Sequence, residues 1–317
     1  MKILKIVIVT ITFSVICNQA NAQFGGINRA VQRGVERAVE KKAEEKAEES
    51  ASKAIDNAEA ERAKGEAEAE KGLNKLAETL ENMQKAQEEA DAQAAAIPDA
   101  IPNVGNTPYS PSESEYAFFP MKKGATQVFV SKDAKGKVTS QSRNTIKEIT
   151  GDKKAFAIAY QSEILDAQGK PVDKDKAMIF NYRVVISDGI MYLDMKGMFG
   201  AMDGLDDVQI SGTSVRIPSN LTVGQTLPDA SVKMKIGIIN CTAIITEGKC
   251  LAVENVTVEA GTFRAYKVSQ KNNITTMGIR SESIALTWYV KGVGAVKTET
   301  YDKNNKLTAV QELKSNN

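Results

Sequence analysis

The residues able to carry chemistry in this chain are few, because the sequence contains no histidine. Imidazole is the usual base for serine and cysteine nucleophiles and the commonest metal-binding side chain in proteins. Its absence excludes Ser-His and Cys-His catalysis and histidine-ligated zinc or haem. The second half of the chain has no nucleophile elbow, no Ser-x-x-Lys motif and no phosphate-binding glycine loop. We therefore expect no enzymatic activity, no catalytic residue and no cofactor.

One acidic cluster has the composition of a cation site. Asp203, Asp206 and Asp207 supply carboxylate oxygens, the ligands that calcium prefers. Their spacing differs from that of an EF-hand loop. We therefore favour a solvated turn and predict no metal site.

A methionine-rich segment precedes and overlaps this cluster. Methionine is flexible and polarizable, so it suits a lining that adapts to apolar groups. We predict a ligand-binding segment at Met191, Met195, Met198, Phe199 and Met202. The alternative is a flap that fills the open side of a curved sheet.

The chain begins with an export signal. Lys2 and Lys5 precede an apolar run, residues 6–16, which is too short to span a membrane comfortably. Small residues at Ala20 and Ala22 predict cleavage after Ala22. Cys17 raises the alternative of a lipid anchor, but the bulky Ile16 before it argues against one. We expect a periplasmic or secreted protein that does not span the membrane.

Cys241 and Cys250 would meet an oxidising compartment, where disulfides form readily. If Glu247-Gly248 is a hairpin turn, the two cysteines lie about four residues apart on one face, and at roughly 3.3 Å per residue this is too far for a bridge. The sequence therefore leaves open whether Cys241 and Cys250 are two buried thiols or form a disulfide.

Composition separates a helical arm from the remainder. Residues 23–96 are rich in Ala, Glu and Lys, which are good helix formers. Within them, Leu73, Leu76, Leu80 and Met83 have the three-four-three spacing of a coiled-coil strip. The arm is predicted to be a solvated stalk, with weak self-association through these four residues as the alternative.

A proline-rich segment, residues 97–115, follows the arm and is predicted to be a spacer that decouples it from the next part. Residues 116–317 alternate short apolar-polar runs with turn signals. The turn signals are Asp133-Ala134-Lys135-Gly136, Gly151-Asp152, Ala167-Gln168-Gly169, Ser187-Asp188-Gly189, Glu247-Gly248 and Lys303-Asn304-Asn305. This pattern predicts a mainly β fold, either a large curved antiparallel sheet or a half-open barrel, preceded by the long helix.

Several segments resemble the TapB-like exported proteins of the Bacteroidetes, which are related to a widespread bacterial domain of unknown function. The segments are residues 116–124, 217–218, 221–229, 254–267 and 288–297. The resemblance implies a secreted or periplasmic β-rich module and brings no catalytic residues. A weaker similarity, at the level of fold alone, is to the half-barrel sheets of lipoprotein carriers.

The net charge of +1 gives no indication of a nucleic-acid partner. We therefore expect a non-enzymatic exported module whose β domain binds an apolar or envelope-derived ligand, such as a lipid, or an envelope protein. The alternative is an assembly factor in which the helical arm forms a weak homo-oligomer.

Overall fold

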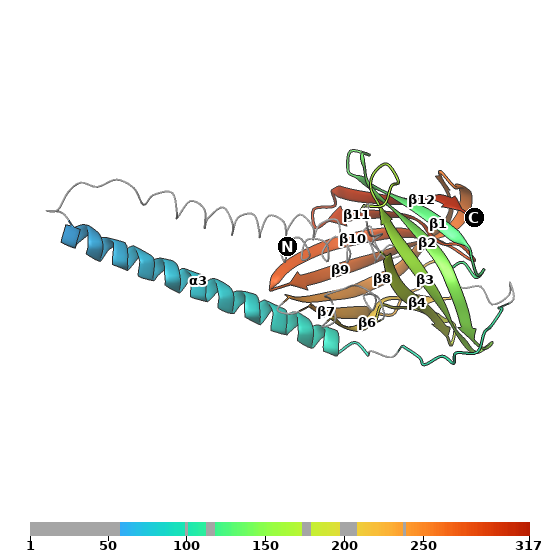
Figure 1. Cartoon of the computed structure of the whole chain (residues 1–317), viewed down its shortest axis with the longest axis horizontal. Helices are drawn as coiled ribbons and strands as arrows, with labels where there is room; N and C mark the ends of the chain where they lie inside the picture. The colour runs from blue at the N-terminus through green and yellow to red at the C-terminus, as the bar shows by residue number, and fades with distance from the viewer. Residues whose placement is uncertain (1–57, 99–100, 112–117, 173–178, 197–207, 237–238) are drawn as a thin grey trace.

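A computed structural model describes residues 58–98, 101–111, 118–172, 179–196, 208–236 and 239–317. These residues form one long helix, α3 (Ala58–Ala95), and a large antiparallel β structure (Figure 1). The strands of the described chain are β1 (Thr126–Asp133), β2 (Val138–Gly151), β3 (Ala155–Leu165), β4 (Ile179–Ser187), β5 (Ile190–Asp194), β6 (Val208–Pro218), β7 (Ala230–Ile236), β8 (Ile239–Val258), β9 (Gly261–Thr276), β10 (Ile279–Val290), β11 (Gly294–Asp302) and β12 (Leu307–Asn316).

The strands close into a barrel. Each strand pairs antiparallel with its neighbour in the chain, and β1 also pairs with β12 from Gln127–Asn316 to Asp133–Ala309. The predicted antiparallel β class and the helix before it are confirmed. Closure depends on β1 meeting β12, a pairing that no local sequence pattern specifies.

Turn chemistry agrees with the predicted turns at most positions. Between β1 and β2, the Asp133 carboxylate accepts the backbone N–H groups of Lys135 and Lys137, and Gly136 has a φ of +79°. Asp166 and Asp302 make the same pair of contacts in the turns after β3 and β11. An aspartate that caps its own turn in this way favours a reversal of the chain.

Glu247-Gly248 is not a hairpin turn, and this prediction was wrong. The strand β8 continues through it, with a bulge between Thr246 and Lys249 in its pairing with β9. A Cβ on Gly248 would lie 2.7 Å from Leu227 Cβ, and Leu227 N donates to Gly248 O at 2.8 Å. The missing side chain of Gly248 therefore leaves room for the loop between β6 and β7, which crosses β8 at this point.

Two phenylalanines fill the barrel between opposite walls. The Phe118 ring lies 5.3 Å from Tyr266 on β9 and 5.9 Å from Tyr289 on β10, measured between ring centroids. Phe119 lies 5.1 Å from Tyr160 on β3. Both phenylalanines are at most 1% exposed and belong to the main hydrophobic core. The first residues of the β region, Phe118 and Phe119, thus fill the interior of the barrel.

The proline-rich segment does not decouple the helix from the barrel, in contrast to the prediction. Tyr109 N donates to Ile149 O at 3.0 Å, and Gly151 N donates to Thr107 O at 2.8 Å. These bonds fix residues 107–109 along the end of β2. Prolines remove donors and limit regular structure, but they leave carbonyls and neighbouring amides free to pair with a strand.

Candidate functional site

A stripe of mostly apolar residues follows the second half of α3. Its members recur every four and three residues: Leu76, Leu80, Met83, Gln87, Ala90 and Ala94. Positions with this heptad spacing lie on one side of a helix. The last turns of this side lie on the outer face of the barrel, whereas the earlier turns project past it (Figure 1). We call this set of heptad positions the seam. Its members are Leu73, Leu76, Leu80, Met83, Gln87, Ala90 and Ala94.

Hydrogen bonds help to hold the docked half of the seam on the barrel. Gln87 Nε2 donates to Thr242 Oγ1 at 3.0 Å, and Gly278 N donates to Gln87 Oε1 at 3.3 Å. The Thr242 hydroxyl in turn donates to the Asp91 carboxylate. Gln87 and Thr242 are buried, so each bond satisfies a group that would be costly to leave alone.

The end of the helix is fixed by side chains of the barrel. Lys233 Nζ donates to Asp91 O at 2.7 Å, and Ser231 Oγ donates to Ala94 O at 3.1 Å. Carbonyls in the last turn of a helix have no partner within it, and a cation there also complements the helix dipole. Lys233 and Ser231 of β7 thus add side-chain bonds near the end of α3, where Ala94 O also accepts from Ile97 N at 3.2 Å.

The projecting half of the seam is exposed. Leu76 is 55% exposed and Leu80 is 57% exposed, whereas Met83 is partly buried at the edge of the barrel. The side chain of Leu73 lies outside the described residues. Self-association through these four residues, as predicted from their spacing, remains a prediction.

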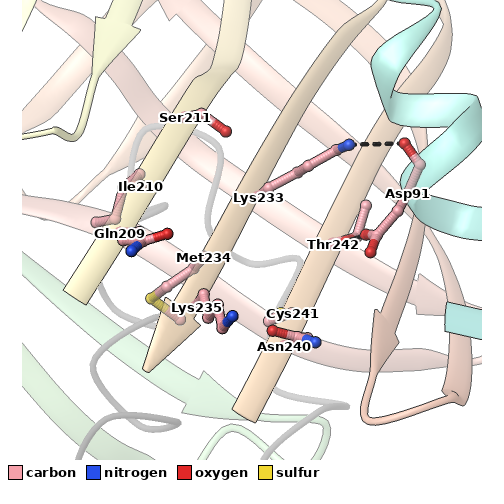
Figure 2. Close-up of a pocket in the computed structure, with 10 residues that line it drawn as sticks. All are labelled: Asp91, Gln209, Ile210, Ser211, Lys233, Met234, Lys235, Asn240, Cys241 and Thr242. Atoms are coloured by element: carbon pink, nitrogen blue, oxygen red, sulfur yellow. Dashed lines mark hydrogen bonds between the residues drawn. The ribbon is translucent and has the colours of Figure 1, made fainter. Parts of the chain in front are cut away.

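A pocket of about 270 Å³ lies beside the docked helix (Figure 2). Two rows of paired residues from β6, β7 and β8 line it. The first row is Ser211, Lys233 and Thr242, and the second is Gln209, Lys235 and Asn240. The Lys233 ammonium points toward Asp91, as the dashed line shows. This lysine is therefore committed to the helix rather than free for a ligand.

The pocket contains one thiol, that of Cys241. Burial raises its pKa to about 11, although a hydrogen bond from Thr276 Oγ1 at 3.3 Å acts in the opposite direction. The thiolate is the nucleophilic form of cysteine, so this thiol is unreactive near neutral pH. Cys250 is also buried, and both cysteines are free thiols. The question that the sequence left open is thus decided against a disulfide.

The predicted ligand-binding methionines divide into two groups. Met191 on β5 is 2% exposed and Met195 is fully buried, and both lie in the main core. Met191 pairs with Ile186 and Ile217 of the neighbouring strands. Met198, Phe199 and Met202, like the three aspartates near them, lie outside the described residues. Met191 and Met195 therefore pack as core residues.

Sequence reasoning missed a charged cluster around the single tryptophan. Trp288 Nε1 donates to Glu254 Oε1 at 2.8 Å, and the ammonium groups of Lys267 and Lys297 lie 4.8 Å and 5.3 Å from its ring centroid. The three strands place Lys267 and Lys297 directly opposite Trp288. The cluster pairs its charges internally, which is typical of a stabilising contact. Only the register of β9, β10 and β11 identifies this cluster, and the sequence alone does not give that register.

Among the described residues, no helix is long and apolar enough to cross a membrane. In the same part of the chain, no three His, Cys, Asp or Glu side chains come together in a group that could hold a metal ion.

Two solved structures have the same fold as the barrel. One is a candidate exported protein with a YmcC-like fold from Bacteroides fragilis NCTC 9343, with 19% identity and a TM-score of 0.53. The other is a candidate lipoprotein from Parabacteroides distasonis ATCC 8503, with 22% identity and a TM-score of 0.53. Each alignment covers 64% of this chain and 99% of the other. No curated protein matches the chain.

The family comparison concerns the barrel rather than the arm. The model of the DUF3108-like family matches residues 122–313, which run from just before β1 into β12. This match covers more than half of the 317 residues. The chain therefore belongs to the DUF3108-like family.

Proposed function

We propose that this protein is a non-enzymatic, exported module in which the barrel holds a helical arm for contact with another protein. The observation that carries the proposal is the continuity of the seam. The same heptad positions that dock on the barrel at Gln87 and Ala90 continue outward as Leu76 and Leu80, which are more than half exposed. Exposed leucines in register on one helix side are typical of a surface that another helix covers.

Export is supported by the signal-like start of the chain and by the descriptions of its two structural neighbours as a candidate exported protein and a candidate lipoprotein. The lipoprotein description counts against our expectation that Cys17 carries no lipid. The intact mass of the protein from its own envelope separates the two forms. Cleavage after Ala22 leaves Gln23 at the N-terminus, whereas lipidation leaves Cys17 with its acyl chains. Within this proposal the finer resemblance to the TapB-like proteins stays a prediction.

An apolar ligand inside the barrel has less support than a protein partner. Phe118, Phe119 and Met191 are each at most 2% exposed and pack among the strands. Charged and polar side chains form part of the lining of the pocket beside α3, and Lys233 is already bonded to the helix. At about 270 Å³ this pocket is also smaller than the sites of about 300–1,000 Å³ that hold drug-sized ligands.

The experiment is site-specific photo-crosslinking in the native envelope. A photoreactive phenylalanine replaces Leu76 in one strain and Lys75 in a matched control, because Lys75 is exposed one position away but lies off the seam. A protein adduct that forms at Leu76 and not at Lys75 supports the proposal. Equal labelling at both positions, or no adduct at Leu76, contradicts it.

A further inference from the structure

One inner wall of the barrel carries polar side chains. Alternate residues of β9 face the same side of the sheet, and Val268 and Ile274 of this alternation belong to the main hydrophobic core. Gln270 and Asn272 lie between them on the same side and are 3% and 1% exposed. Two amide side chains therefore face the interior of the barrel, where apolar residues are the usual choice.

The polar side continues across β10 and β11. Strand pairing places Gln270, Ala285 and Thr300 in one row, and it places Thr287 opposite Thr298 in the next row. The residues of these rows on β10 and β11 are all buried, at most 2% exposed. Only the methyl group of Ala285 stands between the longer polar side chains of Gln270 and Thr300. The two rows thus extend the polar surface inside the barrel over three neighbouring strands.

The polar wall, which consists of these five residues and Asn272, contains buried polar atoms without a hydrogen-bond partner in the described chain. These atoms are Asn272 Oδ1, Asn272 Nδ2 and Thr300 Oγ1. The next row differs, because Thr298 Oγ1 donates to Thr287 Oγ1 at 3.3 Å. An unpaired buried polar group is costly, and protein, water or a ligand normally satisfies it. Asn272 and Thr300 are therefore available to a further molecule inside the barrel.

The composition of the buried residues favours an uncharged molecule. Every buried polar side chain of the described residues is Asn, Gln, Ser or Thr. Asp302 of β11 is the residue opposite Ser283, but its carboxylate accepts the backbone N–H groups of Asn304 and Lys306 in its own turn. A buried charge without a counter-charge costs far more than a neutral polar group. A molecule that contacts the polar wall is therefore expected to be neutral.

We propose that the polar wall binds a small neutral molecule with an amide group, and that Asn272 and Thr300 contact that group. Asn272 Oδ1 requires a donor, and Asn272 Nδ2 requires an acceptor. A primary amide or a ring amide presents an N–H and a C=O on the same edge, so it can form two parallel hydrogen bonds with the Asn272 side chain. The Thr300 hydroxyl can donate to the second lone pair of the ligand carbonyl. Hydrocarbon atoms of the ligand would meet Ala285. This site is separate from the arm and does not depend on the proposed function.

The test is a titration of the mature full chain with 2-pyrrolidinone and, separately, with acetamide, followed through the NMR signal of the Ala285 methyl group. Saturation is expected between about 1 and 100 mM, as for a very small ligand. Tighter binding of 2-pyrrolidinone identifies a ring amide, and tighter binding of acetamide identifies a primary amide. Cyclopentanone is the matched control, since it has the ring and carbonyl of 2-pyrrolidinone but no N–H. It should bind at least about tenfold more weakly, because Asn272 Oδ1 would stay unpaired.

Asn272→Leu keeps the branched shape of the side chain and removes both polar atoms. The variant should bind the amide probes at least about tenfold more weakly. It should also unfold at the same temperature as the native chain or a higher one, because the native amide has no partner in the described chain. Asn181→Leu is the matched control, since Asn181 is exposed on β4, and it should bind like the native chain. Thr300→Val, expected to bind at least about threefold more weakly, provides a second variant of the same wall.

Three results would overturn the inference. The first is a native chain that binds neither amide, and a lower unfolding temperature of Asn272→Leu would then identify ordered water as the only partner of this side chain. The second is equal binding of 2-pyrrolidinone and cyclopentanone. The third is undiminished amide binding in both Asn272→Leu and Thr300→Val.

Discussion

Gly278 and Met83 are in direct backbone contact, because a Cβ on Gly278 would lie 2.1 Å from Met83 O and 2.4 Å from Met83 Cα. The contact joins the β9–β10 turn to the helix at the point where α3 leaves the barrel (Figure 1). It fixes how far the arm projects, since only the turns before Met83 are free of the barrel.

Gly278→Ala is expected to release the docked turns of α3. The new methyl group would overlap backbone, which cannot rotate away as a flexible side chain can. Hydrogen exchange over residues 83–95 should increase, while the fluorescence of the single tryptophan, Trp288, should stay unchanged because the barrel persists.

Gly136→Ala is the control for that substitution. Gly136 has a φ of +79°, against +78° for Gly278, but nothing lies within 4 Å of its added Cβ. Both variants bear the backbone cost of about 1–2 kcal/mol for an L-residue in this region. Equal exchange over residues 83–95 in the two variants would show that the contact with Met83 does not hold the helix.

Thr242→Val is expected to weaken helix docking through lost hydrogen bonds. Thr242 is 1% exposed and bonds both Gln87 and Asp91, so the variant removes two hydrogen bonds and, among these side chains, leaves only the bond from Gln87 Nε2 to Asp91 Oδ1 at 3.1 Å. The expected loss is about 1–3 kcal/mol of docking free energy. Because the helix can detach and rehydrate, the loss should be seen as faster exchange in α3 rather than as global unfolding.

Thr287→Val provides a matched comparison for Thr242→Val. Thr287 is also 1% exposed, but its hydroxyl accepts from Thr298 inside the β10–β11 pair at 3.3 Å. We expect it to lower the melting temperature of the barrel without faster exchange in the helix. A reversed pattern would contradict the assignment of Thr242 to the helix joint.

Glu299 should make part of the stability depend on acid pH. Burial alone would raise the pKa of this carboxyl, but hydrogen bonds from Lys297 at 2.8 Å and Tyr301 at 2.6 Å, with the charges of Lys297 and Lys267, lower it from its usual 4.5. A group with a lowered pKa in the folded state stabilises the fold above its unfolded pKa and loses that effect as pH falls through the folded value. Glu299→Gln should therefore be less stable at pH 7.

The difference between native chain and Glu299→Gln should shrink as pH falls below about 4.5. Urea unfolding at several pH values measures it. Glu148→Gln, at an exposed position on β2, is the matched control. If the difference in the free energy of unfolding between the native chain and Glu299→Gln is constant from pH 7 to pH 3, the ionised carboxylate contributes nothing to stability.

The two thiols of the β region should be unreactive in the folded protein. Burial raises the pKa of Cys241 to about 11 and also raises that of Cys250. A thiol reagent at pH 7.5 should label neither cysteine in the native mature chain and both after denaturation. Rapid labelling of one thiol before unfolding would contradict the buried environment of that residue.

Local chemistry was readable from the sequence where a single turn or helix decides it. Asp133 with Gly136 predicts the first hairpin turn because the aspartate bonds the amides of its own turn. The heptad spacing of Leu76, Leu80 and Met83 likewise identifies one side of a helix. In both cases, the interactions lie within a few residues of one another along the chain.

Glu247-Gly248 failed as a turn signal for the opposite reason. Glycine there is required by Leu227, about twenty residues away, and not by a local reversal of the chain. The same limit applies to Met191, whose neighbours Ile186 and Ile217 come from two other strands. A flexible methionine suits both a binding surface and a core, and only its surroundings decide between them.

The sequence by itself determined the antiparallel β class, the long helix and the absence of histidine chemistry, because composition and short-range periodicity are local properties. The tertiary structure decided three further points: that β1 and β12 close the barrel, that Phe118 and Phe119 fill it, and that the barrel covers only the last turns of the seam. Each depends on contacts between segments distant in the chain. The exposure of Leu76 and Leu80 follows from where the barrel ends, which no spacing of residues in the helix can reveal.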